Sequence, residues 1–185
     1  DGTRKALEVA GVKGAVEGRV PGAIIIPGGG ESALHSTEKR WIPQDEASQA
    51  IGRVAGLLAQ GFGQAPKVLD ACAGRGVKTE QLRAMLGPEA TIMAADRSKA
   101  KLDQARTLVN ADFYCGDLGS SFPGQEGSYD LVFVDAPCSG LGVLRRRPEI
   151  RLRRSEQDLR ALSEIQQKLL SNLSRAVRPG GILLY

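Results

Sequence analysis

The sequence has few of the residues that bind metals or form disulfide frameworks. Its 185 residues include one histidine and three cysteines, Cys72, Cys115 and Cys138. An odd number of widely separated cysteines predicts neither a disulfide framework nor a zinc site. One histidine is also too few for a histidine-based metal site. We therefore expect no bound metal, and the cysteine content favours a reducing, cytoplasmic environment.

Long apolar runs are also lacking. No run approaches the roughly eighteen residues of a membrane span, and the first residues do not resemble a signal peptide. Hydrophobic residues make up 42% of the chain and charged residues 25%, which is typical of one soluble domain. The net charge of +4 weakly favours an anionic partner. We expect no membrane association.

Glycine and proline separate two regions of the chain. Residues 1–43 contain the turn signals Val20-Pro21-Gly22, Pro27-Gly28-Gly29-Gly30 and Ile42-Pro43. They predict a β-rich lead-in segment with a short strand at residues 23–26. Helical periodicity begins after this segment, so residues 44–185 are predicted to form the main domain.

Strands and helices are predicted to alternate along this main domain. Short apolar runs predict strands at residues 68–70, 91–95, 112–115, 130–134 and 182–184. Helical patterns separate them. The last helix is expected to open at Ser155 with Asp158, to carry an apolar face from Leu159 to Val177, and to end before Pro179. This alternation predicts an α/β fold with an open, mostly parallel sheet and helices on both faces.

Aspartates follow four of the predicted strands. They are Asp70, Asp96, Asp117 and Asp135. Ligands of open parallel sheets bind beyond the carboxyl ends of the strands. Four successive carboxylates at these positions favour a ligand with several hydrogen-bond donors.

The loop after the first strand of the main domain has the character of a nucleotide-binding turn. Gly74 and Gly76 allow a close approach of the backbone, and the following helix has an electropositive amino end. Asp96 lies twenty residues after Gly76, where a carboxylate can bind both ribose hydroxyls. Thr79 replaces the third glycine of a dinucleotide fingerprint, and Asp70 would repel a pyrophosphate. The loop therefore predicts S-adenosylmethionine rather than NAD.

A cysteine marks the predicted reactive centre. The fourth strand runs into Asp135-Ala136-Pro137-Cys138-Ser139-Gly140. A thiolate that adds to carbon 6 of a pyrimidine makes carbon 5 nucleophilic, so that carbon 5 can accept a methyl group. Asp135 could hydrogen-bond the edge of the ring. We predict Cys138 and Asp135 as catalytic residues, Cys115 as a core residue, and Cys72 as a backbone contact of the cofactor.

An arginine-rich segment follows this cysteine. Its six arginines are Arg145, Arg146, Arg147, Arg151, Arg153 and Arg154. Next to a pyrimidine site, such a cluster favours contacts with phosphate groups, so we predict these residues as RNA-binding. The enzyme would need an unpaired or extruded nucleotide.

These motifs together resemble the bacterial ribosomal RNA cytosine-carbon-5 methyltransferases of the RsmB/Sun/Fmu type, within the NOL1/NOP2/Sun family. The resemblance covers roughly residues 41–185. It implies a Rossmann-like methyltransferase fold with strand order 3-2-1-4-5 and with the later strands missing. It also implies that Asp96 holds the ribose, that Asp117 lies near the adenine, and that Asp135 lies near the methionine end and the base. The residues that would line the cofactor are Asp70, Cys72, Ala73, Gly74, Arg75, Gly76, Val77 and Lys78.

The sequence departs from this family at two places. The family loop Ala-Pro-Gly-Gly-Lys-Thr is replaced by residues 73–79, in which the glycines are redistributed but Lys78 and Thr79 remain. Family members also place their nucleophile in a Thr-Cys step after the fifth strand, whereas the cysteine like Cys138 assists product release. The sequence ends at Tyr185, immediately before that step, so we expect a truncated chain.

The leading hypothesis is an RNA cytosine-carbon-5 methyltransferase that acts on small-subunit ribosomal RNA through a covalent cysteine–pyrimidine intermediate. Transfer RNA is an alternative substrate. A DNA cytosine methyltransferase, with Cys138 as the nucleophile, is disfavoured by the arginine cluster. A cofactor-binding RNA-binding module without catalysis is the non-enzymatic alternative, and a nicotinamide oxidoreductase fits least well.

Overall fold

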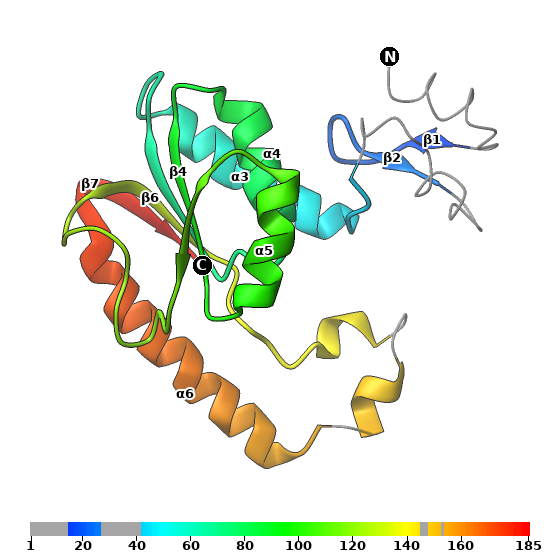
Figure 1. Cartoon of the computed structure of the whole chain (residues 1–185). Helices are drawn as coiled ribbons and strands as arrows, with labels where there is room; N and C mark the ends of the chain where they lie inside the picture. Colours follow the sequence, from blue (N-terminus) through cyan, green and yellow to red (C-terminus); the bar gives the residue numbers. More distant parts are fainter. Residues whose placement is uncertain (1–14, 27–41, 145–147, 153) are drawn as a thin grey trace. The chain divides into compact units, whose positions relative to one another are not determined.

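The computed structural model describes residues 15–26, 42–144, 148–152 and 154–185, and the chain divides into two compact units, Asp1–Val54 and Ala55–Tyr185 (Figure 1). In the first unit, β1 (Val16–Glu17) pairs antiparallel with β2 (Ile24–Ile25). The short strand predicted at residues 23–26 is therefore present, as one arm of a hairpin. The helix α3 (Glu46–Gln60) begins in the first unit and ends in the second.

The second unit is built on a five-stranded parallel sheet. Its strands are β3 (Lys67–Ala71), β4 (Thr91–Asp96), β5 (Asp112–Cys115), β6 (Tyr129–Val134) and β7 (Val177–Leu184). They lie in the order β5-β4-β3-β6-β7, and every neighbouring pair is parallel. Counted within this sheet, the order is 3-2-1-4-5, which confirms the predicted Rossmann-like topology. The chain reverses its direction of winding between β3 and β6, where ligands of such sheets bind.

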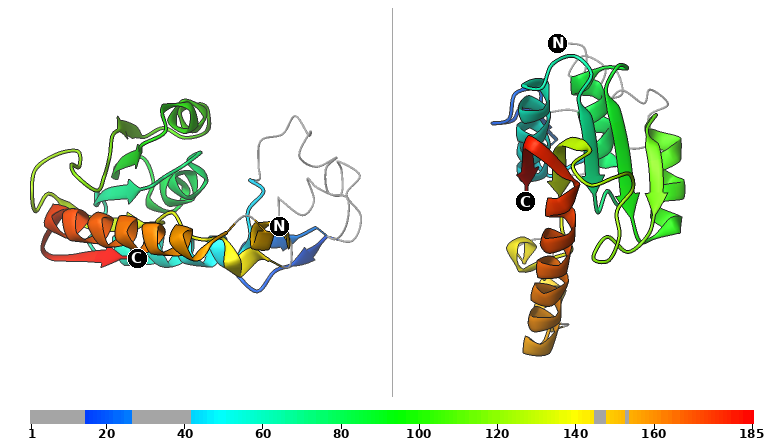
Figure 2. Two further views of the ribbon diagram at one scale, coloured as in Figure 1. Left: turned by 90° about the horizontal axis from the view of Figure 1, so that it is seen from below. Right: turned by 90° about the vertical axis from the view of Figure 1, so that its left-hand side faces the viewer.

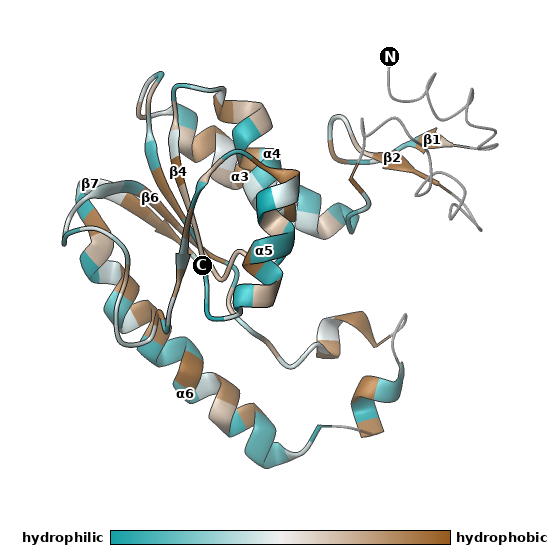
Figure 3. Cartoon of the chain, in the orientation of Figure 1, coloured by the Kyte–Doolittle hydropathy of each residue, from teal (hydrophilic) through white to brown (hydrophobic). Residues whose placement is uncertain are grey.

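Helices cover both faces of the sheet. The described helices of this unit, besides the end of α3, are α4 (Val77–Leu86), α5 (Lys99–Leu108) and α6 (Glu156–Leu173), with the 3-10 turns η1 (Leu141–Val143), η2 (Pro148–Leu152) and η3 (Ser174–Ala176). In the right-hand view of Figure 2, α6 lies in front of the sheet and α4 and α5 lie behind it. Figure 3 shows the strands between them as the most apolar part of the unit.

Each face of the sheet has its own apolar core. On one face, Ala55 and Ala59 of α3 and Leu82 of α4 pack on β-strand residues such as Phe133. On the other face, the carboxyl half of α6 packs on β3 and β6. The alternation of side chains along a strand explains this division, because neighbouring residues such as Val68 and Leu69 point to opposite faces. Both are completely buried, as expected for a parallel sheet.

Only the carboxyl half of α6 is buried. Leu173 is fully buried and Leu169 is 5% exposed, whereas Leu159 is 40% and Ile165 is 36% exposed. The amino half of the helix extends beyond the sheet (Figure 1). This half begins at the predicted position, with Ser155 as the amino-terminal cap in a reciprocal hydrogen-bonded capping box.

The end of α6 and the start of the last strand differ from the prediction. Val177 was expected in the helix and Pro179 was expected to end it, but β7 already begins at Val177. The pairing with β6 shifts register between Val177 and Ile182, so the intervening residues form an irregularity in the strand. Two features stabilise this irregular segment of the strand. Gly180 adopts a left-handed φ of +77°, and Arg178 Nε donates to Asp130 Oδ1 over 2.5 Å.

The position of Cys115 also differs from the prediction. It was predicted as a core residue, but it is exposed. The reason is the place of β5 at the edge of the sheet, which the local sequence does not reveal. Among the described residues, no helix is long and apolar enough to cross a membrane.

The two halves of α6 should respond differently to mutation. Leu173→Ala removes a completely buried side chain and should lower the free energy of unfolding by about 3 kcal/mol. Leu159→Ala, on the exposed half of the same helix, should lower it by less than about 1 kcal/mol. Urea unfolding of both variants measures the difference. Equal losses would contradict the described burial of α6.

Candidate functional site

Three of the predicted aspartates lie at the carboxyl edge of neighbouring strands. Asp70 is in β3, Asp96 ends β4 and Asp135 follows β6. Because β4, β3 and β6 are adjacent and parallel, their carboxyl ends lie side by side. Besides burial, which is the largest cause, the negative charges of Asp135 and Asp96 raise the pKa of Asp70. The sheet topology therefore concentrates acid at one place.

Asp70 is the buried member of this group. Its side chain is completely inaccessible, and its Oδ2 accepts a 2.6 Å hydrogen bond from Thr79 Oγ1. Burial is the main cause that raises the pKa of Asp70 to about 7, while Thr79 and Lys78 act in the opposite direction. Its other oxygen, Oδ1, is buried without a hydrogen-bond partner. A buried oxygen without a partner lowers the stability of the folded state unless a hydrogen-bond donor or a positive charge reaches it.

The loop between β3 and α4 has an unusual backbone. Cys72, Gly74 and Gly76 all have left-handed conformations, with φ values of +63°, +59° and +81°. A Cβ on Gly76 would lie 2.7 Å from Ala105 Cβ, so the approach of α5 excludes any larger residue there. A Cβ on Gly74 would meet no atom closer than 4.0 Å. The space beside the Gly74 backbone is thus open, and the role of this loop in binding the cofactor remains a prediction.

Asp96 connects this loop to β4. Its Oδ2 accepts from the backbone N–H of Gly74 over 3.0 Å, and its Oδ1 accepts from the N–H of Ser98 over 2.8 Å. The residue is 7% exposed. Ser98 is the amino-terminal cap of α5, but its side chain makes no capping hydrogen bond. Each carboxylate oxygen of Asp96 has a second lone pair, which can accept a hydroxyl of a ligand.

Asp135 is paired with the cofactor loop. Lys78, in the first turn of α4, places its Nζ 2.8 Å from Asp135 Oδ2. The Lys78 side chain is 18% exposed and that of Asp135 is 52% exposed, so the pair lies at the surface end of the acidic group. The N–H of Asp135 also donates to Ala71 O over 3.3 Å. The ion pair therefore joins the cofactor loop to the strand end that carries the cysteine motif.

The other predicted cofactor residues have different surroundings. Asp117 is exposed one strand farther along the edge, where its Oδ1 accepts from the N–H of Gly119. Arg75 is also exposed. Cys72 is half-buried, and burial together with the three carboxylates raises its pKa to about 12. Its thiol is therefore neutral and a poor nucleophile.

The predicted catalytic cysteine lies in a turn that two side chains hold. Cys138 is exposed. The carbonyl of Pro137, before it, accepts a hydrogen bond from Gln166 Nε2 over 2.9 Å. The carbonyl of Ser139, after it, accepts from Arg154 Nε over 3.0 Å. The sequence identifies Thr79 as a residue shared with the family loop but does not predict its hydrogen bond to Asp70, and no local signal links Gln166 to Pro137.

Of the predicted RNA-binding arginines, Arg145, Arg146, Arg147 and Arg153 lie outside the described residues. Arg151 is exposed on η2. Arg154 is exposed and donates to the cysteine turn. The RNA-binding prediction for all six remains a prediction.

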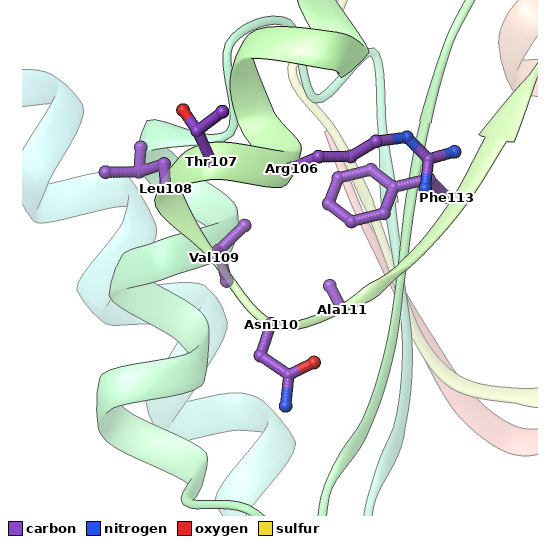
Figure 4. Close-up of a pocket in the computed structure, with 7 residues that line it drawn as sticks. All are labelled: Arg106, Thr107, Leu108, Val109, Asn110, Ala111 and Phe113. Carbon is purple, nitrogen blue, oxygen red and sulfur yellow. The ribbon is translucent and has the colours of Figure 1, made fainter.

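A surface depression elsewhere in the fold does not belong to this site. It is lined by residues at the end of α5 and the start of β5, where Arg106 lies over the ring of Phe113 at 4.5 Å from its centroid (Figure 4). This is the amino end of β5. The acidic group is at the opposite, carboxyl edge of the sheet. Among the described residues, no cluster of acidic, cysteine and histidine side chains could hold a metal ion.

Comparisons with known proteins identify a family of methyltransferases that this chain resembles. The family model described as 16S rRNA methyltransferase RsmB/F matches residues 59–185. The ribosomal RNA small subunit methyltransferase B of Cronobacter sakazakii is 34% identical over 190 residues, which cover 98% of this chain and 43% of that protein. Its counterpart from Escherichia coli is 31% identical and is covered to 42%. The chain thus spans less than half the length of the curated relatives it matches.

Two solved structures have folds similar to that of this chain. The crystal structure of PH0851 has a TM-score of 0.82 at 27% identity, and the match covers 98% of this chain and 42% of that one. NSun6 from Pyrococcus horikoshii, crystallised with SFG, an analogue of S-adenosylmethionine, has a TM-score of 0.63 at 26% identity. That match covers 76% of this chain and 36% of that one.

Asp70 should make the stability of the protein depend on pH. Its folded pKa of about 7 lies above the ordinary value of 3.8, so the folded state keeps a proton that the unfolded chain loses. Stability should therefore fall as pH rises from about 4 to about 7, in total by roughly 4 kcal/mol for this group, and then level off.

Urea unfolding at several pH values tests this expectation. Asp70→Asn cannot titrate and should lose this part of the pH dependence. Thr79→Val removes a hydrogen bond that lowers the pKa of Asp70, so its decline should continue to a higher pH. Identical pH profiles for wild type and Asp70→Asn would show that this carboxyl group has an ordinary pKa.

Proposed function

The chain belongs to the 16S rRNA methyltransferase RsmB/F family, and from this premise we propose that it is the core of an RNA cytosine-carbon-5 methyltransferase. The family predicted from the sequence motifs is confirmed, and so is S-adenosylmethionine as the cofactor. The proposed substrate is small-subunit ribosomal RNA, modified in the cytoplasm. The Lys78–Asp135 ion pair supports the proposal most directly, because it joins the cofactor loop to the Cys138 turn.

The residues at the carboxyl edge suit this cofactor chemically. S-adenosylmethionine carries a sulfonium and an ammonium group but no phosphate, and it supplies a methyl group bound to the positive sulfur. Three carboxylates attract such a cation, and the unpartnered Oδ1 of Asp70 can accept from an ammonium donor. Asp96 would bind the ribose hydroxyls while it holds Gly74 in place. Asp117 would lie near the adenine.

Asp135 and Cys138 would act on the base. Asp135 is half exposed and paired with Lys78, so its carboxylate can accept a hydrogen bond from the amino group of cytosine, or from the ring nitrogen N3 once that nitrogen is protonated. A cysteine thiolate adds to carbon 6, and the ring electrons of carbon 5 form the new bond to the methyl carbon as the bond from that carbon to the sulfonium sulfur breaks and its electron pair stays on sulfur. A base then removes the carbon 5 proton. The electrons of that bond restore the carbon 5–carbon 6 double bond as the thiolate leaves.

Cys138 has one of two roles in this sequence. It supplies the thiolate itself, or it assists the elimination when the family's Thr-Cys cysteine supplies it. Both roles require Cys138 close to the ring, three residues beyond Asp135. The arginines that follow would contact the phosphates of an extruded nucleotide, so RNA affinity should fall with added salt.

Asp96→Asn should weaken binding of S-adenosylmethionine at least about tenfold, because the variant loses a charge and one acceptor at the proposed ribose site. The asparagine oxygen can still accept from Gly74, so the fold should survive. Asp103→Asn, in an exposed ion pair on α5, is the control and should bind normally. Isothermal titration calorimetry measures both affinities. Unchanged affinity in Asp96→Asn would refute the ribose assignment.

Transfer of a radiolabelled methyl group to small-subunit ribosomal RNA tests the reaction. Cys138→Ala should reduce methylated product at least about a hundredfold, a loss typical of a group that acts in the chemical step. Cys115→Ala, which removes the other exposed cysteine, should leave the rate unchanged.

In a chain that includes the family's Thr-Cys step, RNA that contains 5-fluorocytosine separates the two roles of Cys138. If Cys138 is the nucleophile, the alanine variant forms no covalent adduct; if it assists release, the adduct forms and persists on ordinary RNA as well. Equal methylation of DNA would contradict the RNA assignment. Binding of RNA and cofactor without any methyl transfer would instead indicate the non-catalytic RNA-binding module.

A further inference from the structure

The Cys138 turn has hydrogen bonds from side chains on both of its sides. Gln166 donates to the carbonyl of Pro137, in the peptide group that enters Cys138, and Arg154 donates to the carbonyl of Ser139, one residue after it. The first carbonyl belongs to the Pro137–Cys138 peptide and the second to the Ser139–Gly140 peptide. Holding these two planar groups restricts the backbone on both sides of Cys138, and with it the directions open to the Cα–Cβ bond of the cysteine. The thiol is exposed, yet the backbone that carries it is held.

The turn has a third constraint at Gly140. This glycine has a φ of +76°, and a Cβ at its position would lie 3.1 Å from Ile150 Cδ1 on η2. The N–H of Leu141 also lies 3.4 Å from Ser139 Oγ. Beyond the turn the chain forms η1 and η2, and Arg154, which follows them in the sequence, donates back to Ser139 in the turn.

Both donors are tied to α6. Arg154 immediately precedes Ser155, whose capping box with Asp158 fixes the start of the helix. Hydrogen bonds from the backbone and side chain of Ser155 keep the pKa of Asp158 below its usual value, so this cap persists at neutral pH. Gln166 lies about three helical turns farther along, close to Leu169 in the core. The apolar core beneath the carboxyl half of α6 thus supports the residues that hold the cysteine turn.

We propose that Gln166 and Arg154 are positioning residues that hold Cys138 in the orientation needed for its action on the base. This inference rests on the proposed function and adds two residues to it. It also changes the role predicted for Arg154 from the sequence, where it was one of six phosphate contacts. The Nε of Arg154 is directed to Ser139, so its guanidinium group serves the cysteine turn.

The two roles of Arg154 predict different measurements. A phosphate contact contributes to RNA affinity, and its loss reduces the salt dependence of binding by about one counterion. A positioning residue contributes to the chemical step and leaves RNA affinity unchanged. Arg154→Lys separates them, because lysine keeps the charge but lacks the planar Nε–H that reaches Ser139.

Matched variants on α6 provide the test. Gln166→Met keeps the length of the side chain but removes the donor, and Gln167→Met makes the same change at the exposed neighbour. Arg160→Lys, in an exposed ion pair with Glu156, is the control for Arg154→Lys. The first readout is the alkylation rate of each cysteine with iodoacetamide, resolved by peptide mass spectrometry in the presence of S-adenosylhomocysteine.

We expect Cys138 to react about fivefold faster in Gln166→Met and in Arg154→Lys, the factor that corresponds to one lost hydrogen bond. Cys115 should react at the same rate in every variant, which excludes general unfolding. Both controls should match the wild type. Unchanged Cys138 rates in Gln166→Met and Arg154→Lys would overturn the inference.

Methyl transfer provides the second readout. At saturating RNA and cofactor, kcat should fall about tenfold in both variants, while the Kd for RNA and its salt dependence stay constant. A raised Kd for RNA with an unchanged kcat in Arg154→Lys would contradict the positioning role and favour the predicted phosphate contact. If the wild-type chain transfers no methyl group, the proposed function fails, but the alkylation rates still decide whether these residues position Cys138.

Discussion

The accumulation of negative charge at one edge of the sheet is the constraint on which the site depends. Burial, together with the neighbouring charges of Asp135 and Asp96, raises the pKa of Asp70 to about 7, so the ionisation of this carboxyl group costs free energy. Lys78, Thr79 and the backbone of the glycine loop offset part of this cost through direct contacts. At the proposed cofactor site, a positively charged ligand would offset the rest of this cost.

The second constraint is the fixed position of α6 relative to the Cys138 turn. The carboxyl half of α6 is fixed in the core by Leu169 and Leu173, whereas its amino half extends beyond the sheet. Gln166 lies between these halves and reaches the turn that carries Cys138. The first turn of α4 and the helix α6 thus both contact the segment 135–140, α4 through Lys78 and α6 through Gln166. Cys138 therefore lies in a segment that helices on both faces of the sheet contact.

Much of the fold could be predicted because its signals are local. The apolar strands, the capping box at Ser155 and the parallel strand order were all confirmed. The errors arose where distant segments decide the outcome. Val177 continues the helical periodicity but pairs with Tyr129 instead. Cys115 lies in an apolar run but is exposed, because its strand forms the edge of the sheet.

The sequence by itself determined the family and the cofactor, since glycines and aspartates at fixed spacings and a cysteine motif are properties of contiguous segments. Only the tertiary structure decided which side chains meet. The contacts Thr79–Asp70, Lys78–Asp135 and Gln166–Pro137 join residues that are 9, 57 and 29 positions apart. No local pattern specifies such contacts, because they depend on the order of the strands and on the path of α6 across the sheet.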